Sequence, residues 1–298
     1  MHGKYAAMAG AMLSVALSMA LGGCGGDGDA TEMASPAAAT ATEATKYGTT
    51  ATTVTSTTTR WMPAITDTWQ IQLTGKLNTS YPVAMYNFDL FDTPQATIDA
   101  LHAKGQRVVC YFSAGSAEDW RPDYSQFTAS DLGSPLSGWA GERWVDTRSA
   151  NVRRIMQARM NLAMSKRCDG VDADNVDGYT NSTGLPLTAD TQLDYNRFLA
   201  TEAHARGLAI GLKNDIDQVG QLAADFDFAV NEQCFQYQEC GAYSAFTGQG
   251  KAVFNIEYKS RYKTVSQRNA LCAAARAANL RTLVMPANLD GSSRYACD

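Results

Sequence analysis

The sequence predicts an α/β protein built on a single (β/α)8 TIM barrel, and three observations support this fold class. Eight short apolar runs follow one another between residues 68 and 287. Amphipathic segments separate most of these runs, and several end at a glycine such as Gly105 or Gly207, the residue that favours a helix end. The chain has 298 residues, 45% of them hydrophobic and 18% charged, so it is large enough to bury such a core.

The predicted strands and helices alternate along the chain. The eight predicted strands are Thr68–Thr74, Val83–Phe91, Arg107–Ala114, Gly170–Asp174, Leu208–Asn214, Phe226–Glu232, Ala252–Tyr258 and Thr282–Ala287. The predicted helices are Pro94–Lys104, Asn151–Lys166, Thr191–Ala205, a shorter Gln218–Asp225, and Val265–Ala278. Because strands separated by helices pair in parallel, eight such units indicate a barrel.

The first crossover departs from this regular pattern. Residues 75–82 join the first two runs and are too few for a normal helix, so we expect the barrel to be slightly irregular there. An open doubly wound sheet is the alternative fold. Against that alternative, no Gly-x-Gly-x-x-Gly turn follows the first strand.

The N-terminal segment has the pattern of a secretory signal. In residues 1–24, Lys4 precedes the apolar run Ala6–Leu21, and the sequence Leu-Gly-Gly-Cys that ends at Cys24 resembles a bacterial lipobox. We expect Cys24 to be lipidated; ordinary cleavage nearby, with Cys24 removed or incidental, is the alternative. Residues 25–65 are rich in Thr and Ala and predict a disordered linker to a domain over 66–298. The expected location is the outer membrane or cell surface through a lipid anchor, otherwise the exterior as a secreted protein.

The composition excludes several classes of function. The net charge is −5, from 30 acidic and 25 basic residues, so we expect no nucleic-acid partner. The only three histidines are His2, His102 and His204, and His2 lies in the signal segment. A Ser-His-Asp triad or a His-rich metal site would need the other two, so we expect neither of these, no metal and no cofactor. A monomer is expected.

Six cysteines remain after Cys24, and an even number in an exported chain favours disulfides. They are Cys110, Cys168, Cys234, Cys240, Cys272 and Cys297. Six cysteines allow fifteen pairings, and the sequence does not choose among them. Proximity suggests Cys234–Cys240 and Cys272–Cys297, which leaves Cys110–Cys168. A zinc site is disfavoured because no Cys-x-x-Cys spacing occurs.

Carboxylates recur at the carboxyl ends of the predicted strands, the rim where a barrel builds its active site. Strand alternation places Asp172 and Asp174 on one face of the strand, with Val171 and Ala173 on the other. Glu232 ends the sixth strand. A pair of carboxylates from separate strands suits glycoside hydrolysis, which needs neither histidine nor metal. A calcium loop around Asp172 is the competing interpretation, but no closing Glu follows at EF-hand spacing.

Further polar and aromatic residues near the same rim are candidate substrate contacts. They are Trp69, Gln72, Asp89, Tyr111, Asp172, Asp177, Tyr179, Lys213, Asp215, Glu257 and Tyr258. For each one taken alone, a structural role is the alternative: an acidic residue at a strand end can cap a helix or pair with a cation, and an aromatic one can pack in the core.

Six separated motifs resemble glycoside hydrolase family 114, over nearly all of residues 66–298. They are Trp69-Gln70-Ile71-Gln72-Leu73, Asp89-Leu90-Phe91-Asp92, Cys110-Tyr111-Phe112-Ser113-Ala114-Gly115 with Trp120-Arg121-Pro122, Asp172-Ala173-Asp174-Asn175-Val176-Asp177-Gly178-Tyr179, Gly211-Leu212-Lys213-Asn214-Asp215 and Asn231-Glu232-Gln233-Cys234. The resemblance implies a TIM barrel and endo-cleavage of α-1,4-linked galactosamine polymers. It also implies a retaining mechanism in which Asp174 is the nucleophile and Glu232 the acid/base.

An acidic rim suits such a substrate, because galactosamine that is not acetylated carries an ammonium group near neutral pH. We therefore expect a cationic galactosamine-containing polysaccharide as the partner and a fully N-acetylated polymer as a poor substrate. Two other functions stay open from the sequence. One is hydrolysis of another α-linked galactoside, and the other is a non-catalytic carbohydrate-binding lipoprotein at the cell surface.

Overall fold

The computed structural model describes residues 60–258 and 260–298. The predicted signal segment 1–24 with Cys24, and the predicted linker up to residue 59, lie outside the described residues. The described end of that linker packs against the barrel: Arg60 donates to Asp227 at 2.7 Å, and Ala64 forms a bridge with Lys251. Among the described helices, none has the length and apolarity needed to cross a membrane.

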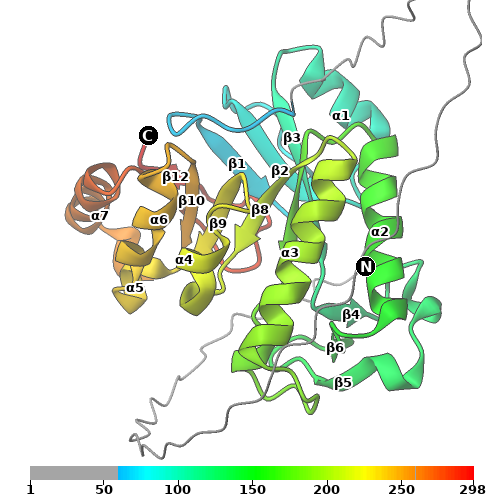
Figure 1. The fold of residues 1–298 in the computed structure, drawn as a ribbon. Coiled ribbons are helices and arrows are strands. Elements are labelled where there is room, and N and C mark those ends of the chain that lie inside the picture. The colour runs from blue at the N-terminus through cyan, green and yellow to red at the C-terminus, as the bar shows by residue number, and fades with distance from the viewer. Residues whose placement is uncertain (1–59, 259) are drawn as a thin grey trace, which may run out of the picture. The chain divides into compact units, whose positions relative to one another are not determined.

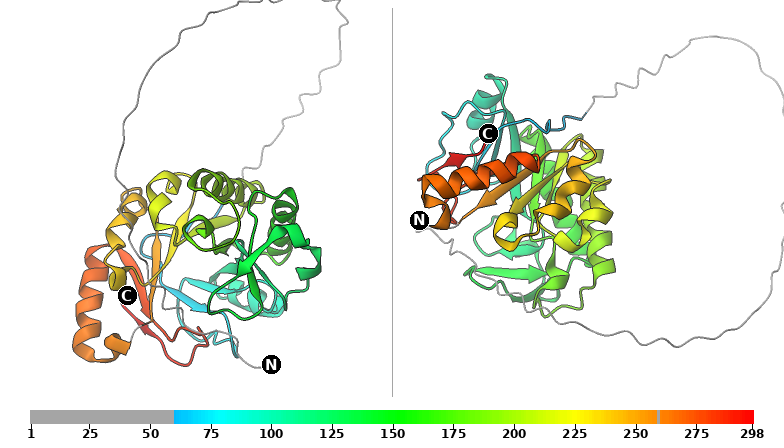
Figure 2. Two further views of the ribbon diagram at one scale, coloured as in Figure 1. Left: turned by 90° about the horizontal axis from the view of Figure 1, so that it is seen from below. Right: turned by 90° about the vertical axis from the view of Figure 1, so that its left-hand side faces the viewer.

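The main sheet contains nine strands, and the first eight of these run parallel in chain order. They are β1 (Trp69–Gln72), β2 (Met85–Asp89), β3 (Arg107–Ser113), β7 (Gly170–Asp174), β8 (Ala209–Lys213), β9 (Phe228–Glu232), β10 (Val253–Glu257) and β11 (Leu280–Val284). The ninth, β12 (Tyr295–Ala296), is antiparallel to β11. Seen from below, the strands and helices surround a common centre (Figure 2). The eight predicted strands and the barrel-like fold are confirmed.

Helices occupy most of the connections between strands. They are α1 (Gln95–His102), α2 (Ala150–Ser165), α3 (Ala189–Ala205), α4 (Val219–Leu222), α5 (Cys234–Tyr237), α6 (Ser244–Thr247) and α7 (Val265–Ala277). Short 3-10 turns are η1 (Tyr124–Gln126), η2 (Ala129–Asp131), η3 (Gly178–Thr180), η4 (Ile216–Gln218), η5 (Cys240–Tyr243) and η6 (Ser260–Lys263). The helices α2 and α3 lie side by side on the outside of the sheet (Figure 1).

Two units of the barrel lack a helix. Residues 73–84, all of them described, form none between β1 and β2, as the short crossover predicts. The same holds for residues 285–298 after β11, where β12 stands instead, and the sequence did not indicate this second irregularity. The ends of the sheet meet through Trp69, whose Nε1 donates to the Arg281 carbonyl at 2.9 Å, and whose carbonyl accepts from Arg294 at 2.9 Å.

Two hydrophobic clusters follow from the alternation of side chains along the strands. One fills the barrel and includes Ile71, Phe228 and Phe254, all fully buried. The other lies between the sheet and the helices and includes Val171 and Ala173. Burial of each large apolar side chain contributes about 1.5–3 kcal/mol, so the two layers account for the near-continuous apolar runs of the strands.

A second, three-stranded sheet is inserted between β3 and α2, and we call it the insert sheet. It consists of β4 (Ser116–Glu118), β5 (Leu132–Pro135) and β6 (Glu142–Val145), in the order β4-β6-β5. Gly115 joins it to β3, and a side chain there would clash with the Asn175 carbonyl, which lies 1.6 Å from a Cβ placed on this glycine. The glycine therefore lets the insert sheet lie directly against the end of β7.

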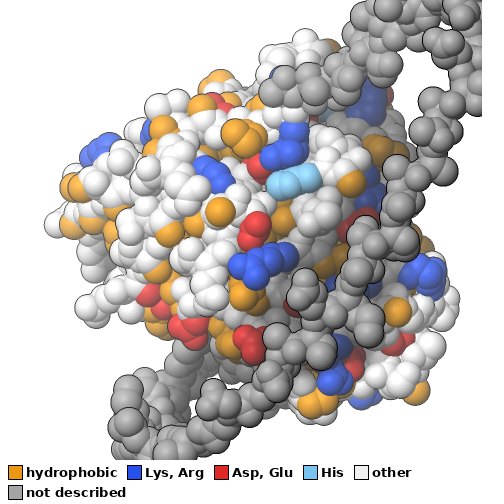
Figure 3. Space-filling model, in the orientation of Figure 1, with side chains coloured by type: hydrophobic (Ala, Val, Ile, Leu, Met, Phe, Trp, Pro, Cys, Tyr) orange, Lys and Arg blue, Asp and Glu red, His pale blue; other side chains and the backbone are white. Residues whose placement is uncertain are grey.

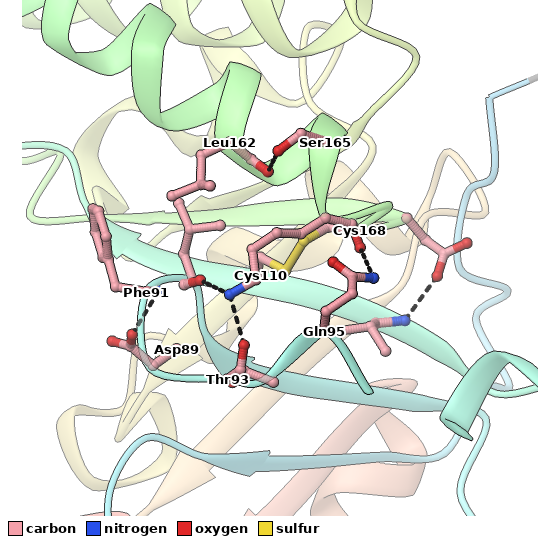
Figure 4. Close-up of a disulfide and its surroundings, with 12 residues drawn as sticks. Asp89, Phe91, Thr93, Gln95, Cys110, Leu162, Ser165 and Cys168 are labelled. Atoms are coloured by element: carbon pink, nitrogen blue, oxygen red, sulfur yellow. Dashed lines mark hydrogen bonds between the residues drawn. A yellow bond between two sulfur atoms is a disulfide. The ribbon is translucent and has the colours of Figure 1, made fainter. Parts of the chain in front are cut away.

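Three disulfides tie the fold together: the two that proximity suggests and the third pair that these leave. Cys110–Cys168 links β3 to the residues before β7 (Figure 4), Cys234–Cys240 closes the loop after β9, and Cys272–Cys297 holds α7 to the last residues. Each restricts the unfolded chain, most strongly the first, which spans 58 residues.

The surface shows no gathering of one sign of charge on the face drawn in Figure 3. On that face, Lys and Arg side chains lie among Asp and Glu side chains, with single hydrophobic ones between them. This mixture agrees with a sequence whose acidic residues outnumber the basic ones by only five.

Candidate active site

A cleft opens at the carboxyl ends of the barrel strands. Its volume is about 1160 Å³ including the open mouth. Strand ends, the loops that follow them and the insert sheet all contribute to its walls. The lining residues are Leu73, Tyr111, Leu136, Trp139, Glu142, Trp144, Asp174, Asn175, Asp177, Asn181, Lys213, Asn214, Glu232, Gln233, Tyr258, Ala287, Asn288 and Leu289. Aromatic walls around a few converging polar groups are typical of a ligand-binding site.

Asp174 is the last residue of β7, and its carboxylate is held on both oxygens. Oδ2 accepts from the Tyr111 hydroxyl at 2.6 Å. Oδ1 accepts from Lys213 Nζ at 3.1 Å and from the Asn175 amide at 2.8 Å. Because Val171 and Ala173 face the helices, the strand turns Asp174 toward the cleft, as the alternation predicts.

Glu232 is the last residue of β9 and is also held on both oxygens. The Tyr258 hydroxyl donates to Oε1, and Asn214 Nδ2 donates to Oε2 at 3.1 Å. The same Asn214 accepts from the Glu232 amide at 2.9 Å through its side-chain oxygen. Asn214 therefore fixes both the backbone and the carboxylate of Glu232.

Lys213 joins the two carboxylates, since its Nζ lies 3.1 Å from Asp174 Oδ1 and 3.6 Å from Glu232 Oε2. These two distances mean that Asp174 Oδ1 and Glu232 Oε2 lie at most about 6.7 Å apart. Glycosidases hold their two carboxyl groups about 5–9.5 Å apart. The two side chains therefore converge in one cleft, within a limit that includes the separation of retaining glycosidases.

The charges in the cleft favour an ionised Asp174. Burial pushes the pKa of Asp174 upward, but the Lys213 ammonium and the Tyr111 hydroxyl outweigh it, so the pKa lies below its ordinary value. Burial also disfavours the Lys213 ammonium, yet the neighbouring carboxylates raise its pKa above the usual range. In contrast, burial and the charge of Asp174 raise the pKa of Asp177 to about 6.

Six of the residues predicted from the sequence line the cleft together. They are Tyr111, Asp174, Asp177, Lys213, Glu232 and Tyr258. Those from the barrel strands occupy alternate positions that face the centre, and Asp177 follows β7 in the loop. The structure thus brings together the two candidate catalytic carboxylates and four of the eleven candidate substrate contacts.

Three candidates from the first half of the chain lie in the protein interior instead. Trp69 is fully buried and packs on Phe254, with ring centroids 5.0 Å apart, so it has no surface for a sugar. Gln72 is fully buried and binds the loop after β1, donating to the carbonyls of Thr74 and Lys76. Asp89 is paired with Arg121, which donates to both of its oxygens.

Four further candidates lie near the cleft but do not line it. Asp172 is fully buried one layer below Asp174, and Asn87 donates to it at 2.7 Å. Asp215 accepts from Asn196 of α3 at 2.8 Å. The remaining two are Tyr179, on η3, and Glu257, which accepts from the Phe235 amide. Since successive strand residues face opposite sides, Glu257 and Tyr258 cannot both point into the barrel.

Two groups of lining residues were not predicted as substrate contacts from the sequence. Asn175, Asn214 and Gln233 each follow the last residue of a strand and adopt a left-handed backbone conformation, with φ of 60°, 49° and 66°. Asn at a strand end is a signal for such a turn, because its side chain tolerates this conformation. The second group, which includes Trp139, Glu142 and Trp144, comes from the insert sheet and its connections, where no strand was predicted.

The stability of the fold should decrease as the pH rises from about 5 to 8. Burial, followed by the charge of Glu118, raises the pKa of Glu142 from 4.5 to about 8, with Asp174 adding to the shift and Arg121 opposing it. The folded protein therefore keeps a proton that the unfolded chain releases, and this contribution is full below pH 4.5 and lost as the pH passes 8.

A Glu142→Gln variant removes this titration, so its free energy of unfolding should fall less over the same range. The expected difference is on the order of a few kcal/mol. Urea unfolding of both proteins at pH 5 and pH 8 measures it, with Glu202→Gln on α3 as the control that keeps the wild-type slope. Parallel slopes for wild type and Glu142→Gln would show that this carboxyl is not protonated in the fold.

No group of three or more His, Cys, Asp or Glu side chains within residues 60–258 and 260–298 is arranged to hold a metal ion.

Comparisons with known proteins identify a matching family model and two similar solved structures. The model of glycoside-hydrolase family GH114 matches residues 50–298. A solved structure of Aspergillus fumigatus Ega3 in complex with galactosamine is 46% identical, with a TM-score of 0.76, over 80% of this chain and 98% of that one. The glycoside hydrolase domain of PelA from Pseudomonas aeruginosa has a TM-score of 0.60 over 76% of this chain and 96% of that one, and at 14% identity it shows the fold alone. Among curated proteins no match was found.

Proposed function

The chain belongs to glycoside hydrolase family GH114 and is a glycosidase, and on this premise we propose that it cleaves α-1,4-linked galactosamine polymers at internal bonds. The observation that carries the proposal is the convergence of Asp174 and Glu232 on Lys213 in one cleft. The complex of the related Ega3 with galactosamine supports an amino sugar as the unit that is bound.

The proposed mechanism retains the configuration of the anomeric carbon. The limit of about 6.7 Å on the distance between the two oxygens includes the separation of retaining enzymes, about 5–5.5 Å, and barely reaches the lower end for inverting ones. Asp174, which Lys213 and Tyr111 keep ionised, attacks the anomeric carbon. Glu232 protonates the leaving oxygen at the same time, so the glycosidic bond breaks and a glycosyl ester forms on Asp174.

The second step reverses these roles. Glu232, now a carboxylate, takes a proton from water as the water attacks the anomeric carbon, and the ester to Asp174 breaks. The exposures of the two side chains suit this assignment. Glu232 is the more open of the two, 29% against 19%, and it is the group that must reach both the leaving oxygen and solvent.

The proposed location is outside the cytoplasm. Three disulfides are typical of a protein that folds in an oxidising compartment, and residues 1–24 have the pattern of a signal with a lipobox at Cys24. A lipid anchor would be its only contact with a membrane, and the linker would give the enzyme reach toward an exopolysaccharide.

Product analysis with the purified protein tests the proposed function. We expect α-1,4-galactosamine oligomers to yield new reducing ends and a range of internal fragments by mass spectrometry, and the N-acetylated oligomers to react poorly. Release of galactose from α-galactosides, without cleavage of the cationic oligomer, would instead identify another α-galactoside as the substrate. Binding of the oligomer without any product would identify a carbohydrate-binding protein.

A further inference from the structure

The insert sheet places two buried acidic side chains directly opposite each other. Glu118 on β4 pairs with Glu142 on β6 in the antiparallel ladder, and the two residues are 2% and 6% exposed. Like charges at opposite positions of two strands destabilise a sheet, and burial adds the cost of removing each carboxylate from water. Such a pair is therefore unfavourable unless a cation or a proton compensates it.

Arg121 forms hydrogen bonds with only one member of this pair. Its guanidinium donates to both oxygens of Glu118, at 2.7 and 2.8 Å, and to both oxygens of Asp89, at 3.0 and 2.6 Å. These bonds use four of the five N–H groups of the arginine. Two carboxylates thus share one positive charge, and no net positive charge is left for Glu142.

Glu142 itself has only a neutral partner. Its Oε2 accepts from the Ser116 hydroxyl at 2.9 Å, and Ser116 in turn contacts Ser113 at 2.6 Å, so the carboxyl is fixed in position. Within the part of the chain that the structure describes, Glu142 forms no ion pair with a Lys, Arg or His side chain. It is nevertheless the member of the acidic pair that lines the cleft.

The surroundings of Glu142 in the cleft suit a positively charged group of a ligand. Trp139 and Trp144 from the same insert line the cleft with it, and aromatic walls that exclude water strengthen an electrostatic contact. The nearby Asp174 and Glu118 are negative, and burial together with these charges raises the pKa of Glu142 to about 8. A bound cation would release this proton and supply the positive partner that an ionised Glu142 lacks.

We propose that Glu142 binds the ammonium group of a galactosamine unit in the cleft and thereby determines the preference for free-amine over N-acetylated substrate. This inference rests on the proposed function and adds the residue that recognises the amino group of the substrate. An acetamido group carries no charge, so a bound N-acetylated unit would leave Glu142 protonated and without an ionic partner in the cleft. The acidic pair would then be retained in the protein because the ammonium group of the substrate supplies the positive charge that the pair lacks.

Binding measurements test this inference separately from hydrolysis. The Asp174→Asn background prevents turnover, and isothermal titration calorimetry at pH 6.5 compares a galactosamine trisaccharide with its N-acetylated form. Adding Glu142→Gln should weaken binding of the free-amine form by at least about tenfold and leave the acetylated form within about twofold. Glu142→Asp, which keeps the charge, should preserve part of the preference. Adding Glu202→Gln, which removes a charge on α3 outside the cleft, should change neither affinity.

These outcomes distinguish the role of Glu142 from the proposed hydrolysis of galactosamine polymers. Equal weakening of both ligands by Glu142→Gln, or an unchanged preference, would overturn the role of Glu142 even if the wild-type enzyme cleaves the polymer. A selective loss would support that role even if the wild type proved to cleave another bond in an amino-sugar polymer. Circular dichroism of each variant establishes that it is folded, and if Glu142→Gln does not fold, the same comparison is made with Glu142→Asp. In that case, a partial loss of the preference supports the inference, because the shorter side chain keeps the charge but cannot reach the ammonium equally well, and full retention contradicts it.

Discussion

The Asp174→Asn variant is expected to cleave galactosamine oligomers on the order of 10³-fold or more slowly than wild type, with its fold intact. An amide nearly conserves the shape of the carboxylate but cannot form the glycosyl ester. Tyr111 can still donate to the amide oxygen, and Lys213 still faces Glu232, so the loss should appear in kcat more than in stability. Initial rates from a reducing-end assay, together with thermal unfolding, measure the two effects.

The matched control for this variant is Asp194→Asn, which makes the same substitution on α3, where the side chain is 71% exposed. This control should retain wild-type kcat and KM. If Asp174→Asn kept more than about a tenth of the wild-type rate, the nucleophile would have to be another group, because covalent catalysis does not survive loss of its nucleophile to that extent.

The Glu232→Gln variant is expected to lose a similar factor on natural oligomers but much less on substrates with an activated leaving group. An activated group such as fluoride departs without protonation, so the first step no longer needs an acid. The second step still lacks its base, and a glycosyl enzyme should accumulate. Azide, which needs no deprotonation, should restore turnover and give a glycosyl azide with the starting anomeric configuration.

This pattern distinguishes the two carboxylates. Azide should not rescue Asp174→Asn in the same way, because that variant cannot form the ester in the first place. Rescue of Asp174→Asn with an azide product of retained configuration, and none of Glu232→Gln, would mean that the two roles are exchanged. Glu202→Gln is the control for the Glu-to-Gln change and should behave as wild type on both kinds of substrate.

The barrel was predictable because each of its strands is buried on both faces and so appears as a nearly continuous apolar run. Val171 and Ala173, which pack against the helices, flank Asp172, which faces the centre, and this alternation also predicted the direction of Asp174. Two of the disulfides agree with the proximity of their cysteines in the chain, and the third joins the two cysteines that remain.

The insert sheet was not predictable in the same way. Its strands have only three or four residues, and they mix Ser, Gly, Pro and charged side chains with the buried Ala117, Trp144 and Val145. Nothing in such segments produces a periodic apolar pattern. Because one wall of the cleft comes from this sheet, the sequence revealed the catalytic carboxylates but not Trp139, Glu142 or Trp144.

The candidate contacts that failed to reach the cleft show a second limit. Being near the end of a strand does not decide which way a side chain points. Gln72 lies next to Ile71, which fills the barrel, and it therefore faces the loop instead. Asp89 forms an ion pair with Arg121, which lies in the segment after the insert strand β4. Both outcomes depend on contacts between distant parts of the chain, which the local sequence does not contain.

Mass spectrometry of a trapped intermediate identifies the residue that attacks the anomeric carbon. The Glu232→Gln variant is mixed with an α-galactosaminyl fluoride, quenched with acid and digested. We expect one added galactosaminyl unit, attached to the peptide that contains Asp174. An adduct on another residue, or no adduct while sugar of inverted configuration is released, would contradict it.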